Sequence, residues 1–270
     1  MSTQNLIHPT AIVDENAKIG TNVTIGAYSV VGPDVVLEDN VTLKSHVCVE
    51  GVTAIGEGTM IYPFAAVGTA PQDLKYRGEK SRLIVGKNCS IREHVTMHTG
   101  TADGSMETRT GDNCLFMVGV HVAHDCIIGN NVIMANNATL GGHVVVGNNV
   151  LIGGLSAVHQ FVRIGDFSVI GGMSGVESDV IPFGRVKGER AFLAGLNLIG
   201  LERNGFEKSD IRLMQKAFSQ LFSDGGTMDN RIEKVETEYS DNESVQKIID
   251  FAKEKSRFPL CQPPKQKKVS

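Results

Sequence analysis

The chain has 270 residues, 41% of them hydrophobic, and a formal net charge of −4 at pH 7. That length suits one large domain or two modest ones, and the small charge argues against a nucleic-acid partner. The five cysteines include no CxxC pair, which argues against a disulfide framework. The N-terminus has no basic region followed by an apolar run, and no apolar stretch is long enough to cross a bilayer, so we expect neither a signal peptide nor a transmembrane segment. We therefore expect a cytoplasmic protein.

A six-residue repeat begins at Ile7 and continues to Val67, with an aliphatic residue at every sixth position. The period returns at Val85 and, in a shifted register, runs from Val122 to Val176. Glycine often follows the aliphatic residue, where it eases a tight corner. A period of six is typical of a hexapeptide β-helix, in which three hexads close a triangular coil of about 18 residues. Stacked coils create the core that one hexad lacks, so we predict a parallel β-helix over residues 1–189.

Two polar segments interrupt the repeat, at residues 69–84 and 98–109. Neither keeps the six-residue period, so both are predicted to leave the β-helix as loops. Loops that project from a rigid scaffold are a favoured place for function.

Helical spacing of apolar residues replaces the repeat toward the C-terminus. Ser209 is a plausible N-cap for the segment SDIRLMQKAFSQLF, and further helices are predicted at about 230–239 and 244–255. We therefore predict an α-helical C-terminal domain at 190–260 that covers an edge strand of the β-helix. The Lys-rich end at 261–270 is predicted to be a basic disordered tail.

Four histidines fall within the second run of the repeat: His121, His124, His143 and His159. The last three together span nearly two coils, which places them near one corner on successive coils. Such a column could form a site without any loop, although polar corners can also be plain solvated turns. Acyl transfer from a thioester to a hydroxyl requires a base, commonly histidine, and an oxyanion donor such as a backbone N–H.

Five segments carry a specific resemblance to a known family: QDLKY (72–76), HVAHDC (121–126), NNATLGGHV (136–144), AVHQF (157–161) and GLERNGF (200–206). Over nearly its whole length the chain resembles the UDP-N-acetylglucosamine acyltransferases of lipid A biosynthesis. The resemblance implies a left-handed β-helix and transfer of a 3-hydroxyacyl group from acyl carrier protein, held as a phosphopantetheine thioester, to the sugar 3-hydroxyl. It also implies a homotrimer with sites between subunits, no bound cofactor and no metal.

The resemblance also implies roles for individual residues. His124 matches the general base, Asp125 its partner and the Gly142 N–H the oxyanion donor, although neighbours on a strand would point to opposite sides. Gly172 matches the position that limits acyl chain length, and glycine there implies a long chain. The substrate-binding positions match Gln72, Asp73, Lys75, His98, His121, His143, His159, Gln160, Asn197 and Arg203.

Asn204, Arg190 and Ile199 depart from the family pattern near the nucleotide or acyl end, which leaves exact substrate contacts open. One alternative is transfer to the 3-amine of a UDP-diamino sugar. A second is a zinc hydratase with three histidine ligands on the same fold. Two others are a non-catalytic scaffold and a later N-acyltransferase of the pathway, which usually carries an extra N-terminal domain.

Overall fold

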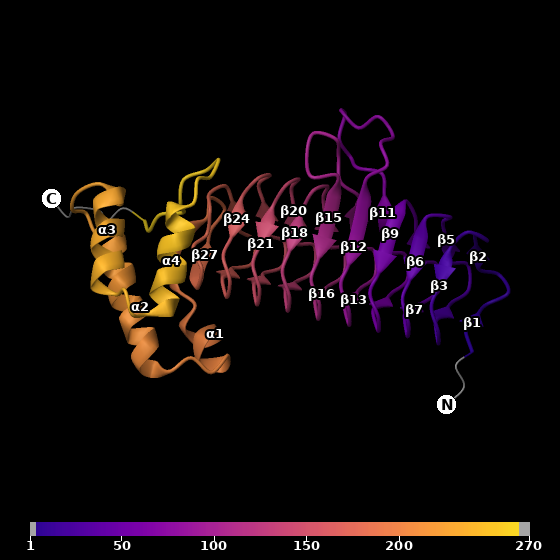
Figure 1. Ribbon diagram of the computed structural model, residues 1–270, viewed down its shortest axis with the longest axis horizontal. Coiled ribbons are helices and arrows are strands. Elements are labelled where there is room, and N and C mark those ends of the chain that lie inside the picture. The colour runs from indigo at the N-terminus through magenta and orange to yellow at the C-terminus, as the bar shows by residue number, and fades with distance from the viewer. Residues whose placement is uncertain (1–3, 265–270) are drawn as a thin grey trace.

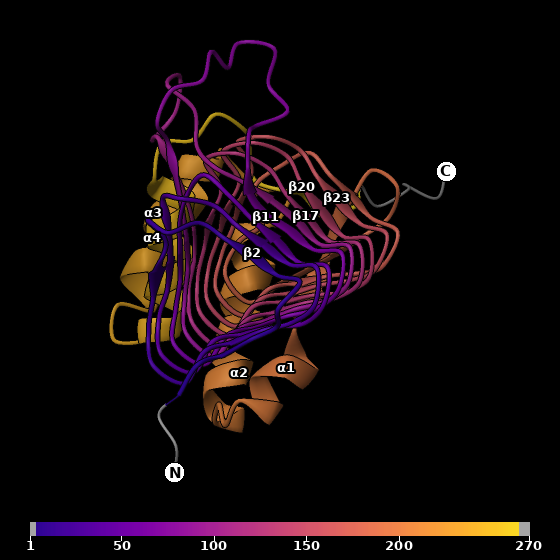
Figure 2. The same ribbon diagram turned by 90° about the vertical axis from the view of Figure 1, so that its right-hand side faces the viewer.

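The computed structural model describes residues 4–264. The chain forms a left-handed parallel β-helix, which confirms the predicted fold class, and a group of helices follows at its C-terminal end (Figure 1). Seen along its length, the β-helix has three flat faces that meet at rounded corners (Figure 2).

Each face of the β-helix is one sheet, and we call these sheets A, B and C. Sheet A contains β1 (Leu6–Ile7), β4 (Thr24–Ile25), β7 (Thr42–Leu43), β10 (Met60–Ile61), β13 (Ser90–Ile91), β16 (Leu115–Phe116), β19 (Ile133–Met134), β22 (Leu151–Ile152), β25 (Val169–Ile170), β27 (Gly184–Lys187) and β28 (Phe192–Leu196). Sheet B contains β2 (Ile12–Val13), β5 (Val30–Val31), β8 (Cys48–Val49), β11 (Ala66–Thr69), β14 (Thr96–His98), β17 (His121–Val122), β20 (Thr139–Leu140), β23 (Ala157–Val158) and β26 (Gly175–Val176). Sheet C contains β3 (Lys18–Ile19), β6 (Val35–Leu37), β9 (Val52–Ile55), β12 (Arg82–Val85), β15 (Glu107–Thr110), β18 (Ile127–Ile128), β21 (Val145–Val146) and β24 (Arg163–Ile164).

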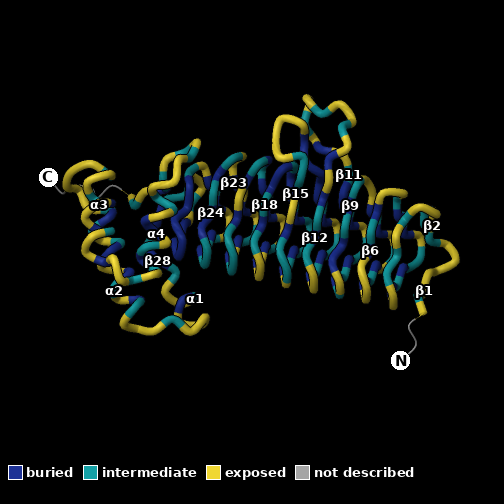
Figure 3. Tube along the Cα trace, in the orientation of Figure 1, coloured by how far each residue is buried: buried dark blue, intermediate teal, exposed yellow. Residues whose placement is uncertain are grey.

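The aliphatic residues of the hexads form one continuous core along the axis. Strands three apart in sequence pair in parallel, so that Ile25 lies beside Leu43 in sheet A and Val31 lies beside Val49 in sheet B. All four side chains are at most 1% exposed. Their strand neighbours point outward, which gives the alternating bands of buried and less buried chain in Figure 3.

The corners require backbone conformations that residues other than glycine rarely adopt. At the corner where sheet C leads into sheet A, asparagine repeatedly takes a positive φ, as in Asn22, Asn40 and Asn131. Asparagine tolerates this left-handed region better than most residues because its short side chain can bond locally. The repeated corner residues are therefore set by backbone geometry.

The two interruptions of the repeat are loops, but shorter than the sequence suggests. They span residues 70–81, between β11 and β12, and 99–106, between β14 and β15, because the flanking strands extend into the polar segments. Both leave the corner between sheets B and C (Figure 1). Lys75 Nζ in the first loop lies 3.1 Å from Asp103 Oδ2 in the second, so the loops support each other.

Beyond the last coil, sheet A continues into an antiparallel hairpin of β27 and β28. The range 190–260 is therefore not wholly helical, because β28 extends the sheet and covers the edge of β27. The helices that follow are α1 (Leu198–Arg203), α2 (Lys208–Leu221), α3 (Met228–Glu238) and α4 (Glu243–Lys253). Within the described chain, no helix is long and apolar enough to cross a membrane.

The start of α2 differs from the prediction. Ser209 lies inside the first turn, and Glu207 precedes the helix without a side-chain capping bond. The helix is held instead by its apolar side, on which Ile211, Met214 and Ala217 are buried. The N-caps of α3 and α4, by contrast, are side chains that accept backbone N–H bonds.

The chain after α4 returns to the β-helix. Leu260 bridges Asp179 in parallel, and the Cys261 N–H donates to the Asp179 carbonyl at 2.7 Å. Cys261 is 3% exposed, so the predicted disordered tail 261–270 is wrong at its start, because this segment pairs backbone groups at the end of the last coil. Residues 265–270 lie outside the described residues.

Val145 and Val146 in β21 offer a matched test of the core. Val146 is 2% exposed and Val145 is 41% exposed. Val146→Ala is expected to lower the free energy of unfolding by about 1.5–3 kcal/mol, because it removes buried methyl groups and leaves a cavity. Val145→Ala should change it by less than about 0.5 kcal/mol. Urea unfolding at one fixed protein concentration measures both, and equal losses would contradict the assignment of the inward face.

Candidate active site

A groove of about 1040 Å³ runs along the corner between sheets B and C, below the two loops. It is formed by the loops, by three successive coils and by the segment that follows α4. Its lining residues are Gln72, Asp73, Leu74, Lys75, Asp103, His124, His143, His159, Gln160, Phe161, Arg257 and Phe258.

The coil register brings the groove side chains together. Asp125, His143 and Phe161 follow one another at intervals of one coil and share the same corner conformation, with φ of 59°, 62° and 67°. His124 precedes the first of them by one position, and His159 precedes the last by two. Of the four histidines predicted to form a column, His124, His143 and His159 line the groove, although they do not occupy equivalent places in their coils, and His121 does not line it.

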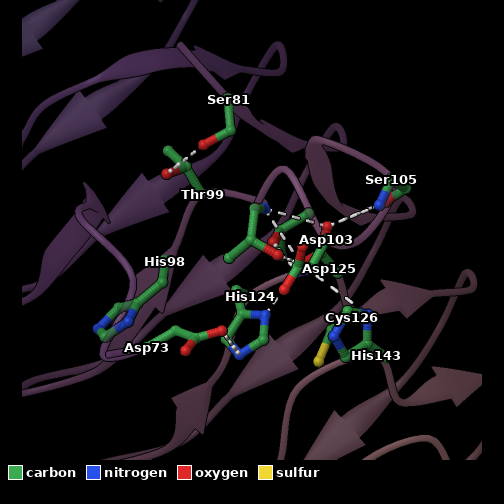
Figure 4. A network of polar contacts seen from close by, with 12 residues as sticks. Asp73, Ser81, His98, Thr99, Asp103, Ser105, His124, Asp125, Cys126 and His143 are labelled. Atoms are coloured by element: carbon green, nitrogen blue, oxygen red, sulfur yellow. Dashed lines mark hydrogen bonds and ion pairs between the residues drawn. The ribbon is translucent and has the colours of Figure 1, made fainter. Parts of the chain in front are cut away.

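His124 and Asp125 form a direct hydrogen bond, with Nδ1 of the histidine 2.9 Å from Oδ2 of the aspartate (Figure 4). The expectation that neighbouring side chains point to opposite sides does not apply, because both residues lie in a turn. The positive φ of Asp125 turns its carboxylate back toward the preceding ring. The bond fixes the His124 tautomer, with the proton on Nδ1 and a lone pair on Nε2.

The second loop holds the Asp125 carboxylate in place. Thr101 donates its hydroxyl to Oδ2 at 2.6 Å. The Ser105 N–H donates to Oδ1 at 2.9 Å (Figure 4). Burial by itself would raise the pKa of Asp125, but hydrogen bonds from Thr101 and His124 outweigh it and lower that pKa below its usual value. Asp125 is therefore an anion that orients His124 and can stabilise its protonated form.

Gly142 lies directly against the reactive edge of His124. A Cβ atom on Gly142 would stand 2.5 Å from Cε1 and 2.6 Å from Nε2 of the ring, so a side chain there would displace the histidine. The Gly142 N–H has no acceptor among residues 4–264. On the other side, Asp73 Oδ2 lies 3.9 Å from His124 Nε2. The His124 ring thus lies between the Gly142 backbone and the Asp73 carboxylate.

His98 and His121 form a second pair beside the groove. Their rings meet edge to face at 5.0 Å, and the Gln72 N–H donates to His98 Nδ1 at 3.2 Å. Burial lowers the pKa of His98 to about 4, helped by the charges of His121 and His124. Burial also lowers the pKa of His121. His98 thus anchors the first loop and His121 packs against His98, and neither ring is among the residues that line the groove.

His143 is held between two rings. It meets the ring of His124 edge to face at 5.0 Å and stacks on Phe161 at 4.2 Å with an interplanar angle of 4°. Burial lowers the pKa of His143, and the charges of His124 and Arg257 lower it further, while Asp125 and Asp73 oppose the shift. A neutral His143 can accept or donate one hydrogen bond to a ligand.

Three predicted site residues lie elsewhere in the same chain. Gly172 is in the corner between sheets A and B, and Arg203 ends α1. Asn197 caps α1 and donates its amide to the Phe167 carbonyl at 2.9 Å. Figure 2 shows α1 at a different corner from the loops. A site that uses all the predicted residues would need surfaces from more than one chain.

The three residues that depart from the family pattern also lie in this region. The side-chain amide of Asn204 donates to the Gly200 carbonyl, Arg190 Nη1 lies 3.9 Å from Glu177 Oε2, and Ile199 is 64% exposed. None of the three lines the groove.

Several residues in or beside the groove carry no signal in the sequence. Thr101 and Ser105 are residue types common in loops, and they bind Asp125, which lies in the next coil. No local sequence pattern therefore identifies them. Phe161 lies within a recognised segment but has no obvious polar role. Arg257 and Phe258 come from a segment far along the chain, and only the return of that segment to the β-helix reveals them.

His124, Asp125 and His143 could in principle hold a metal, since one donor atom from each lies within 4.8 Å of the others. Both Asp125 oxygens, however, already accept hydrogen bonds from Thr101, Ser105 and His124. A metal would displace bonds that orient the histidine, so this donor set suits proton transfer better than metal ligation.

Comparisons with known proteins agree with this geometry. The profile of the family described as UDP N-acetylglucosamine O-acyltransferase, domain 2, matches residues 179–261, and the bacterial transferase hexapeptide profile matches residues 16–51 and 107–142. The chain is 54% identical to an acyl-[acyl-carrier-protein]–UDP-N-acetylglucosamine O-acyltransferase of Rickettsia canadensis, over 97% of this chain and 98% of the relative. It is 53% identical to the enzyme of the same name from Rickettsia prowazekii, with the same coverage.

Solved structures give the same result. The UDP-N-acetylglucosamine acyltransferase of Campylobacter jejuni superposes with a TM-score of 0.90 at 38% identity, covering 96% of this chain and 100% of that one. The Francisella novicida enzyme of that name gives a TM-score of 0.93 at 32% identity, with coverage of 96% and 95%. The similarity therefore extends over both the β-helix and the helices.

The depressed pKa of His98 predicts a loss of stability in acid. The unfolded chain takes up a proton near pH 6.5, whereas the folded chain resists it until about pH 4, so stability falls as the pH drops through that window. His98→Asn can still accept the Gln72 N–H and cannot titrate. Between pH 7 and pH 5 the wild type should lose about 1–2 kcal/mol more unfolding free energy than the variant. Equal losses in urea unfolding would contradict a neutral buried His98.

Proposed function

We propose that this chain, which belongs to the UDP-N-acetylglucosamine O-acyltransferase family, transfers an acyl group from acyl carrier protein to the 3-hydroxyl of UDP-N-acetylglucosamine. The observation that carries the proposal is the His124–Asp125 pair, whose histidine lines the groove and lies against the backbone of Gly142. Acyl transfer needs a base, and a backbone N–H such as that of Gly142 can serve as the oxyanion donor.

In the proposed mechanism, His124 Nε2 removes the proton from the sugar hydroxyl as its oxygen attacks the thioester carbon. The Asp125 carboxylate stabilises the imidazolium that forms, through the bond to Nδ1. Asp125 remains charged, because the Thr101 and Ser105 bonds favour its anionic form.

The tetrahedral intermediate carries negative charge on the former carbonyl oxygen, and the Gly142 N–H donates to it. When the intermediate collapses, the carbon–sulfur bond breaks and the phosphopantetheine sulfur leaves. The imidazolium of His124 returns its proton to that sulfur, which restores the neutral base and completes the proton balance. No step requires a metal or a bound cofactor.

The groove residues suit the recognition of a polar sugar. Asp73 and His143 flank His124 and can bond sugar hydroxyl groups, while Gln72, Lys75, His159 and Gln160 surround them. His98 supports the first loop through its bond with the Gln72 N–H, and His121 packs against His98. We assign these eight residues to substrate binding or to its support, with a 3-hydroxyacyl chain as the donor group.

A homotrimer would complete the site. Asn197 and Arg203 are suited to the nucleotide and the carrier, and Gly172 to the acyl chain, yet all three lie away from the groove of their own chain. In a trimer with sites between subunits, a second copy would supply them. A Cβ on Gly172 would be 3.3 Å from the Gly154 carbonyl oxygen. Glycine therefore leaves the surface of this corner free of a side chain, which favours a long acyl chain.

The relatives' names favour the sugar hydroxyl over the 3-amine as acceptor. The same likeness, over nearly the whole chain, leaves the zinc hydratase, the scaffold and the later N-acyltransferase without support. The reaction would be the first acylation of lipid A biosynthesis. We place it in the cytoplasm, because all five cysteines are unpaired, as suits a reducing compartment.

The assignment of the base is tested by His124→Ala in an assay with 3-hydroxyacyl carrier protein and UDP-N-acetylglucosamine. Loss of the base should lower kcat by about 10²- to 10⁴-fold, with unchanged circular dichroism. His8→Ala, an exposed histidine of the first coil, is the matched control and should retain activity. Full activity of His124→Ala would remove the proposed base. An inactive wild type would remove the proposed reaction.

The close approach of Gly142 to His124 gives a second test. Gly142→Ala should push the imidazole out of line and lower kcat by about 100-fold, because small displacements of a catalytic group are costly. Gly225→Ala is the control, since a Cβ there meets nothing within 4 Å. A Gly142→Ala enzyme with normal kcat would show that the His124 ring does not react from this position.

A further inference from the structure

The segment after α4 contributes an unusual ring stack to the groove. The Arg257 guanidinium carbon lies 4.0 Å from the centroid of the Phe161 ring, and Phe161 stacks in turn on His143 at 4.2 Å. Next to it, Phe258 meets the His159 ring edge to face at 5.4 Å. Two consecutive residues of this segment thus contact the same coil, the one that follows the coil of His143.

Arg257 is the uncompensated cation of the groove. The other cationic side chain that lines it, Lys75, is paired with Asp103 at 3.1 Å. Arg257 has no carboxylate within ion-pair distance and no hydrogen-bond acceptor anywhere in residues 4–264. It is also exposed, so its N–H groups are open to a ligand.

The position of Arg257 is fixed from both sides along the chain. Before it, the Glu254 carboxylate pairs with Arg163, whose own Nε lies 2.8 Å from the buried Asp179 carboxylate. After it, Leu260 pairs with the backbone of Asp179. A short segment anchored at both ends loses little further entropy when Arg257 binds a ligand.

A guanidinium that lies on an aromatic ring keeps its N–H edges free. Such an edge matches two oxygens of a phosphate group and can bind them with paired hydrogen bonds. Both proposed substrates carry phosphate: the sugar nucleotide has a diphosphate on the reacting sugar, and the carrier has a phosphodiester at the far end of its pantetheine arm. Without Arg257, Lys75 would be the remaining Lys or Arg side chain of the groove lining that could bind a phosphate, and Lys75 is already paired with Asp103.

We infer that Arg257 binds a substrate phosphate group at the mouth of the groove, with Phe161 as the platform that orients its guanidinium. The inference rests on the proposed function for the identity of the two phosphate-bearing substrates. The diphosphate and the phosphodiester share the recognised chemistry, and experiment can distinguish them. Arg257 is a binding residue in this assignment, and proton transfer remains with His124.

The test compares Arg257→Met with Arg257→Lys. Methionine retains an apolar contact with Phe161 but carries no charge, and lysine keeps the charge but not the paired N–H edge. Arg257→Met should raise the KM for one substrate about 5- to 30-fold with a much smaller change in kcat, and Arg257→Lys should fall between it and the wild type. Lys255→Met, an exposed cation of the same segment outside the groove lining, should leave both KM values unchanged.

The substrate whose KM rises identifies the source of the phosphate. A higher KM for UDP-N-acetylglucosamine indicates the diphosphate, and a higher KM for the acyl carrier indicates the phosphodiester. Calorimetric titration with UDP and with 4′-phosphopantetheine provides a readout that does not depend on turnover. Weaker binding of either probe by Arg257→Met supports the site even if the wild type transfers no acyl group, a result that would overturn only the proposed reaction. Wild-type affinity for both probes, or a fall in kcat with both KM values unchanged, would overturn the phosphate site.

Discussion

The structure depends on the register of its stacked coils. Each short strand has backbone partners only in the coils above and below it, and an offset of one coil brings residues of one kind together at each level. The inward position is fully enclosed, so it must be apolar, and burial of this row stabilises every coil through its neighbours. Outward and corner positions are free of that demand, which is why the polar residues of the site can be placed there.

The two loops are compatible with this register because they leave and rejoin the coil at a corner. Pairing in sheet A continues across them, so that Met60 still lies beside Ser90 and Ser90 beside Leu115, although each of these coils is longer than the regular ones. The extra residues leave the packing of the core unchanged, and they supply the side chains that hold the site residues in place. The second loop fixes the Asp125 carboxylate through Thr101 and Ser105, and the first brings Asp73 to the other side of His124.

The C-terminal unit does more than cover the end of the β-helix. The buried Asp179 carboxylate binds Arg163, Arg163 binds Glu254, and the chain beyond Glu254 runs back to the groove. This ion-pair chain therefore determines where Arg257 and Phe258 lie. A buried carboxylate with one partner removed is costly, so the docking of α4 and the shape of the groove are coupled.

The sequence by itself determined the β-helix, its inward residues, the approximate helices and the histidine-rich corner, because each follows from a pattern repeated with every hexad or every helical turn. The resemblance supplied the reaction and the candidate residues. Only the tertiary structure decided that Asp125 turns back toward His124, that Gly142 leaves room for its ring, and that Gly172, Asn197 and Arg203 lie at other corners. It also brought Arg257 to Phe161 from a distant part of the chain. A repeat encodes interactions that every coil makes in the same way, whereas these contacts each occur once, between segments that meet only after the coils have stacked.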